Sequence, residues 1–249
     1  MGAYLQGTRT QPRGSRRRSL AGALRSPRIP PAPAQPTRLL KRQGRSVKGR
    51  DAMKVVERVA ERLAHGVRGW MAMGAVVLFV LFTATVLPAQ AEAGAFYTVR
   101  YAAPDTSVWY FPDDLYAAAE AWGREGRAAY VHARVTFDVI WPLVYGTFLL
   151  TTLAWVWARG TASGSRWRGV ALLPVLAVTL DYAENICTAT VMARYPARTP
   201  VLAELAPLFT AGKWLTLSAS FLLLVIGLLI ALTAWWRARS SRWPRSESG

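Results

Sequence analysis

The sequence has few of the residues that build metal, redox and thiol sites. It contains one cysteine, Cys187, and two histidines, His65 and His132, in 249 residues. A single cysteine excludes an internal disulfide, a CxxC redox centre and a zinc site made of several thiolates. We therefore expect no metal and no cofactor, and we interpret Cys187 as an inert, packed thiol.

Acidic residues are absent from the first 50 positions, which are rich in Arg, Ser, Pro and Gly. Such a composition cannot bury a core, so residues 1–52 are predicted to be a disordered basic tail. Three origins compete: a cytoplasmic tail, an organelle transit peptide, or upstream sequence included through a wrong start codon. We favour the last, because Met53 begins a basic amphipathic stretch that leads into the first apolar run.

Positive charge is concentrated in the same part of the chain. Residues 1–69 hold 17 Lys and Arg against three acidic residues, out of a formal net charge of +17 for the whole chain. No aromatic residues interleave with these basic residues and no nucleic-acid-binding motif accompanies them. Cytoplasmic flanks of membrane proteins are commonly basic, so a membrane surface is a better partner than nucleic acid.

Long apolar runs dominate the rest of the chain, and 52% of all residues are hydrophobic. Runs of about 20 apolar residues are long enough to cross a bilayer as helices. The sequence therefore predicts an all-α integral membrane protein, a bundle of four transmembrane helices with the lipid bilayer as its surroundings. The predicted spans cover residues 70–88, 133–158, 169–192 and 207–236, and residues 237–249 form a basic C-terminus.

The first apolar run has an alternative interpretation. Pro88 is expected to end it, and Ala89-Gln90-Ala91 is a small-x-small sequence of the kind that signal peptidase cleaves. The run is long for the core of a signal peptide, and its leader carries two glutamates. We therefore favour an uncleaved span.

Residues 89–130 form the sizeable polar segment between the first two spans. They hold six acidic residues against three arginines, together with several aromatic residues. Pro112 and Asp113 favour a helix start, and Gly123 and Gly126 are expected to interrupt that helix. Leu115, Ala118, Ala119 and Trp122 share one face, so we predict a short amphipathic helix on the membrane surface in preference to a substrate lid.

The distribution of arginines predicts the orientation. Basic residues precede the first span, lie between the second and third, and follow the fourth, whereas residues 89–130 are net acidic. The positive-inside rule then places both termini in the cytoplasm of a multi-pass protein of the plasma membrane.

Ionisable residues interrupt three of the predicted spans. On the third, Asp181, Glu184 and Asn185 lie three and four positions apart and so share a helical face. Counting turns at 1.5 Å per residue places Asp138, Glu184 and Lys213 at one level, about 9–12 Å below the outer surface of the bilayer. The resulting candidates for ligand binding or a proton relay are Asp138, Tyr145, Asp181, Glu184, Asn185 and Lys213.

Two functions are compatible with this cluster. The first is binding or transport of a small molecule, a lipid or a proton, with acid-base catalysis as the less favoured variant. The second is a structural or assembly role, in which the cluster only fixes helix packing and Lys213 neutralises one carboxylate. A cavity that reaches the cluster would favour the first function, and a dry, fully paired core the second. We interpret His132 and Arg134 as membrane-interface anchors.

Residues 112–215 resemble a group of uncharacterised four-span membrane proteins. The resemblance rests on a GxEGRxxY sequence, an aspartate before an aromatic-proline pair, an LPx6DxxEN sequence, a Tyr-Pro turn and a lysine-aromatic pair. The matching residues are Gly123, Glu125, Gly126, Arg127, Tyr130, Asp138, Trp141, Pro142, Pro174, Asp181, Glu184, Asn185, Tyr195, Pro196, Lys213 and Trp214. The resemblance implies the four-span fold and its topology but no activity, and it adds Gly126, Arg127 and Tyr130 as candidate residues.

Overall fold

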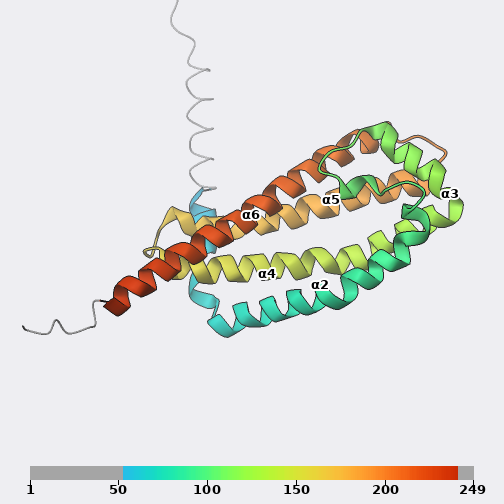
Figure 1. Cartoon of the computed structure of the whole chain (residues 1–249). Helices are drawn as coiled ribbons and strands as arrows, with labels where there is room; N and C mark the ends of the chain where they lie inside the picture. The colour runs from blue at the N-terminus through green and yellow to red at the C-terminus, as the bar shows by residue number, and fades with distance from the viewer. Residues whose placement is uncertain (1–52, 241–249) are drawn as a thin grey trace, which may run out of the picture. The chain divides into compact units, whose positions relative to one another are not determined.

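The computed structural model describes residues 53–240, which form helices and, within that range, no strand. The helices are one over residues 53–66, then α2 (Gly69–Thr98), α3 (Pro112–Val135), α4 (Phe137–Gly160), α5 (Leu173–Arg194) and α6 (Pro200–Ser240) (Figure 1). Short 3₁₀ helices lie in two connections, η1 (Pro104–Thr106) and η2 (Arg166–Leu172). The predicted tail over residues 1–52 and the last part of the predicted C-terminus, residues 241–249, lie outside the described residues.

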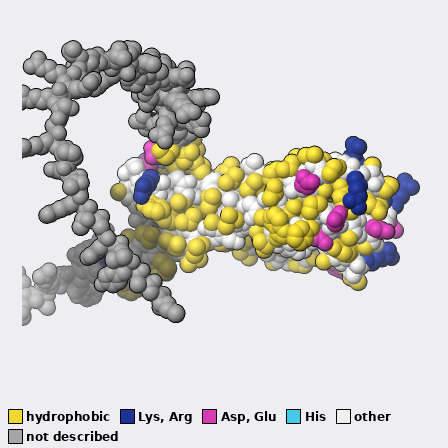
Figure 2. Space-filling view, turned by 90° about the horizontal axis from the view of Figure 1, so that it is seen from above, with side chains coloured by type: hydrophobic (Ala, Val, Ile, Leu, Met, Phe, Trp, Pro, Cys, Tyr) yellow, Lys and Arg dark blue, Asp and Glu magenta, His cyan; other side chains and the backbone are white. Residues whose placement is uncertain are grey.

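Within residues 53–240, four helical stretches are long and apolar enough to cross a membrane, which confirms the predicted fold class. They are Gly69–Thr98, Pro112–Gly160, Arg166–Arg194 and Pro200–Arg239. On the face shown in Figure 2, hydrophobic side chains cover the middle of the bundle, while charged side chains gather mainly at its right-hand end. An apolar band between charged ends is the surface that a bilayer requires.

Two helices extend well beyond the predicted spans. Helix α2 continues through Pro88 and through the small-x-small sequence as far as Thr98, and α6 begins at Pro200, ahead of Pro207. A proline removes one backbone hydrogen bond, but a helix in a bundle can continue through it. The Ala-Gln-Ala-Glu-Ala sequence after Pro88 has high helix propensity and favours continuation. Pro200 occupies the first helical position, where its missing N–H costs nothing.

The predicted amphipathic helix is present but is longer and differently packed. Helix α3 extends to Val135, and its one interruption is at Gly123, which has a φ of 64° and a ψ of −172°. The predicted apolar face, which includes Leu115 and Trp122, is buried against Cys187 and Val191 of α5 and Ala203 and Ala206 of α6, whose side chains belong to the same core. The position of α3 at the membrane surface stays a prediction, but α5 and α6, and not lipid, cover its apolar face.

The four spans are packed unequally. Helices α5 and α6 pack most extensively, α4 packs against both, and α2 packs mainly against α4. Helix α2 also packs against α3, but the backbones of α2 and α6 do not approach each other closely. The bundle is thus a compact core of α4, α5 and α6 with α2 attached to one side, as Figure 1 also shows.

The end of the bundle opposite α3 is held together by Glu61 of the helix over residues 53–66. Its carboxylate accepts hydrogen bonds from the Ser163 hydroxyl at 2.6 Å and from the Arg168 guanidinium at 2.8 Å. These bonds, the hydroxyl contributing most, lower the pKa of Glu61 from 4.5 to about 2. Glu61 is therefore ionised at physiological pH and links this helix to the α4–α5 connection.

The contact between α2 and α3 predicts which glycine substitution is harmful. A Cβ atom at Gly126 would lie 2.8 Å from the Cβ atoms of both Trp122 and Tyr97. Since Cβ atoms move only with their backbone, we expect Gly126→Ala to lower the free energy of unfolding by about 1–3 kcal/mol. Thermal unfolding in detergent measures this, with Gly74→Ala as the control because nothing lies within 4 Å of that position. Equal stability of the two variants would contradict the close packing.

Candidate functional site

Lys213 of α6 lies against two carboxylates of α5, which confirms the predicted contact with Glu184. Its ammonium group forms an ion pair with Glu184 Oε2 and lies 3.6 Å from Asp181 Oδ1. The side chain of Glu184 is completely buried, and those of Asp181 and Lys213 are about nine-tenths buried. Desolvated charges of this kind are stable only when they are paired, so Lys213 is essential to the α5–α6 contact.

Asp138 was predicted to lie beside Lys213, but the structure pairs it with Arg134. The guanidinium of Arg134 lies 2.9 Å from Asp138 Oδ2 and donates a hydrogen bond to Asn185 Oδ1 at 3.0 Å. It also lies over the ring of Tyr130, 4.3 Å from the ring centroid. Sequence reasoning missed this role of Arg134 and interpreted it as an interface anchor. The spacing of four residues between Arg134 and Asp138 is the signal that could have revealed the pair.

Asp181 and Glu184 have different polar neighbours. Tyr145 of α4 donates a hydrogen bond to Asp181 Oδ2 at 2.9 Å, so this predicted candidate does lie beside the cluster. Glu184 Oε1 lies 2.7 Å from the hydroxyl of Thr210, which is 3.2 Å from the hydroxyl of Tyr110. Tyr110 precedes α3 and is buried, so the loop before α3 also reaches the cluster.

The two sides of the cluster are joined by Asn185. Its side-chain oxygen accepts from Arg134, and its amide nitrogen lies 3.4 Å from the backbone oxygen of Asp138 and 3.5 Å from Asp181 Oδ1. An amide side chain both donates and accepts hydrogen bonds, so it suits this position between the guanidinium of Arg134 and the carboxylate of Asp181. We interpret Asn185 as a positioning residue that connects α5 to the α3–α4 junction.

The residues that were added through the resemblance lie in three different surroundings. Tyr130 is buried and borders the cavity described below, whereas Gly126 lies in the α2–α3 contact. Arg127 donates to the backbone oxygen of Ala119 at 2.7 Å and lines a separate groove. Of these three candidates, only Tyr130 is brought to the acidic cluster.

A cavity of about 640 Å³ reaches the cluster from the α3 end of the bundle. Helices α2, α3, α4, α5 and α6 all contribute to its wall. The polar part of the wall includes Arg134, Asp138, Tyr145, Asp181 and Lys213. The apolar part includes Leu87 and Ala91 of α2, Phe137 and Trp141 of α4, and Leu217 of α6. A largely apolar cavity with a few converging polar groups is typical of a small-molecule site.

The cluster contains more acids than bases. Its three carboxyl groups belong to Asp138, Asp181 and Glu184, and its two cationic groups to Arg134 and Lys213. Asp138 is matched with Arg134, and Glu184 with Lys213. This leaves Asp181, whose partners are the Tyr145 hydroxyl, the Asn185 amide and, at the longer distance of 3.6 Å, the shared Lys213. Asp181 is thus the surplus carboxyl, and it lies on the cavity wall.

Comparison with known proteins gives no match: no family model, no curated protein and no solved structure is significantly similar to this chain. The resemblance of residues 112–215 to uncharacterised four-span proteins therefore stays a prediction. The chemistry of the cavity wall is the basis for a functional proposal.

The buried ion pair between Lys213 and Glu184 predicts strongly non-additive mutations. Lys213→Met or Glu184→Gln alone removes one charge from the pair, and we expect each to destabilise the protein by about 3–5 kcal/mol. The double variant should cost less than the sum. A double-mutant cycle read by unfolding in detergent measures the coupling. The exposed pair Arg198–Asp113, 3.5 Å apart, is the control and should couple by less than about 1 kcal/mol. Additive effects at Lys213 and Glu184 would contradict the ion pair.

Proposed function

We propose that this protein binds a membrane-dissolved amphipathic molecule with a cationic head group, and that Asp181 receives the positive charge. The observation that carries the proposal is the surplus carboxyl of Asp181 on the wall of a cavity that also reaches the cluster's two ion pairs. With every group ionised, the cluster has one negative charge in excess. In a low-dielectric interior such a charge favours binding of one cation.

Aromatic side chains around the cavity support a cationic ligand. Tyr130, Phe137, Trp141, Tyr145 and Trp214 all border the cavity. The faces of aromatic rings attract ammonium groups, most strongly where water is excluded. The indole N–H of Trp214 is buried and, among the described residues, has no hydrogen-bond partner, so it can also bind an acceptor atom of the ligand.

The weak contact between α2 and α6 supports entry from the bilayer. Both helices line the cavity, yet their backbones do not approach each other closely. Helix α2 contributes apolar side chains to the cavity wall, among them Leu87 and Ala91. An alkyl chain can therefore lie between the two helices while its head group reaches Asp181.

Binding or transport of a cation uses both the cavity and the surplus carboxyl of Asp181 on its wall. A purely structural role, the alternative function, accounts for the ion pairs but not for the cavity beside them.

We also propose that the protein lies in the plasma membrane with both termini in the cytoplasm. The support is the basic connection between α4 and α5, which includes Arg166 and Arg168, together with the basic residues that flank the outermost spans. A reporter fused at Ser163 should then give a cytoplasmic signal, and one fused at Ser107 an external signal. The reverse result at both positions would contradict the orientation.

The test of the binding proposal is the variant Asp181→Asn. The amide oxygen can still accept from Tyr145, and the pairs Arg134–Asp138 and Lys213–Glu184 are left intact, so the fold should persist. We expect the affinity of the purified protein for dodecylamine to fall by about tenfold, because a charge-assisted contact is lost. Affinity for the neutral probe dodecanol should change little. Equal loss for both probes, or no loss for either, would refute the role of Asp181.

A second pair of variants tests the cavity itself. Ala91 and Ala93 are both exposed residues of α2, but only Ala91 lines the cavity. We expect Ala91→Phe to occupy part of the cavity and weaken dodecylamine binding, and Ala93→Phe to leave it unchanged. Equal affinities of these two variants would place the amine elsewhere on the protein.

A further inference from the structure

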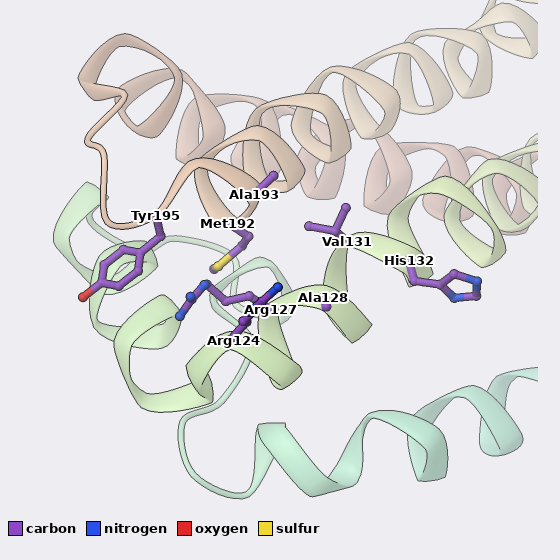
Figure 3. A pocket seen from close by; sticks show the side chains of 8 residues that line it. All are labelled: Arg124, Arg127, Ala128, Val131, His132, Met192, Ala193 and Tyr195. Atoms are coloured by element: carbon purple, nitrogen blue, oxygen red, sulfur yellow. The ribbon is translucent and has the colours of Figure 1, made fainter.

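A second pocket, of about 520 Å³, lies between α3 and the end of α5 and is separate from the acidic cavity. We call it the α3–α5 groove. Figure 3 shows Arg124 and Arg127 of α3 lying close together, near Met192 of α5 and Tyr195 just beyond it. None of the residues that line the groove belongs to the acidic cluster, so its chemistry is independent of the proposed function.

The backbone of α3 explains how two arginines come to line the groove. The left-handed φ of 64° at Gly123 redirects the helix, and Arg124 is the first residue after this kink. A Cβ atom at Gly123 would meet nothing within 4 Å, so the glycine is required by its backbone conformation and not by lack of space. Arg124 and Arg127 are three residues apart and therefore share a face of the redirected helix.

The groove is electropositive, and its arginines retain free donors. Arg127 is held by its hydrogen bond to the oxygen of Ala119 and by stacking on Tyr195, 4.8 Å from the ring centroid. A guanidinium has five N–H donors, so this arrangement orients Arg127 and leaves donors for a ligand. Arg124 is exposed and makes no side-chain hydrogen bond or ion pair to any described residue. No carboxylate lines the groove.

The partial negative charge at the C-terminus of α5 does not cancel the positive charge of the groove. A helix C-terminus carries about half a negative elementary charge, which disfavours an anion. Arg194, in the last turn of α5, opposes it, and the two guanidiniums of the groove add two full positive charges. The balance favours an anion with oxygen atoms that can accept from a planar guanidinium, which phosphate does well.

The position of the groove indicates where that phosphate comes from. The groove is lined by the part of α3 that precedes α4 and by the C-terminal end of α5. This is the edge of the apolar band, at the depth of lipid head groups. Val131 and Met192 give it an apolar side next to the arginines. Basic pockets between helices at this depth suit anionic lipid head groups.

We propose that the α3–α5 groove binds the phosphate of an anionic phospholipid, with Arg124 and Arg127 as its donors and Val131 and Met192 against its glycerol and first acyl carbons. The lipid occupies the outside of the bundle between α3 and α5. It thereby stabilises the kinked part of α3, which also borders the acidic cavity.

The first experiment removes one charge inside the groove and one outside it. Dioctanoyl phosphatidylglycerol is titrated onto the full chain in a neutral detergent, and bound lipid is counted by native mass spectrometry. Arg124→Gln should weaken binding by about tenfold, since a charge-assisted contact is lost. Arg198→Gln removes a charge from another exposed arginine at the same end of the bundle and should weaken binding by less than about twofold. Equal effects of the two variants would overturn the proposal.

The second experiment adds a charge without removing an arginine. Ala128 is exposed, lines the groove and lies one helical turn from Arg124. Ala128→Glu should abolish selective binding of phosphatidylglycerol by occupying Arg124, whereas Ala128→Gln, of the same size, should not. Loss of binding in both variants, or in neither, would overturn the assignment. Displacement of the lipid from the wild-type chain by millimolar inorganic phosphate would show that the groove holds a free anion, and would overturn the lipid as its occupant.

Discussion

The ion pair between Lys213 and Glu184 is the interaction on which the rest of the described structure depends. Two desolvated charges must stay together in a low-dielectric interior, and this requirement sets how α5 and α6 lie along each other. The remaining polar contacts of the cluster follow from that register. Asp181 sits one turn from Glu184 on the same face, where Tyr145 and the cavity meet it.

Helix α3 relates the acidic cavity to the α3–α5 groove. Helix α3 carries Tyr130 and Arg134 to the cavity, and Arg124 and Arg127 to the groove. The close approach of Gly126 to Tyr97 fixes α3 against α2, and α2 is the helix with the least packing among the spans. Both pockets therefore border the same helix.

The sequence predicted the spans and most of the cluster for clear physical reasons. Twenty apolar residues have few alternatives to a transmembrane helix, and charges within such a run must find partners. It did not predict the pairing of Arg134 with Asp138, because a basic residue near the end of a span usually anchors the interface. It also did not show that α5 and α6 cover the apolar face of α3, because an amphipathic pattern does not reveal whether lipid or protein covers that face. The continuation of α2 through Pro88 was missed for a similar reason, since the local signal for a helix end was outweighed by the residues that follow.

The sequence by itself determined the fold class, the number of spans and the polar residues that had to meet inside the bundle, since apolar length and helical periodicity are properties of the chain alone. Only the tertiary structure decided which acid pairs with which base, and therefore that Asp181 is the surplus carboxyl. It also decided that a cavity lies beside the cluster and that two arginines line a groove outside it. These features depend on how helices from distant parts of the chain approach each other, and small residues, kinks and buried charges on several helices set those approaches together.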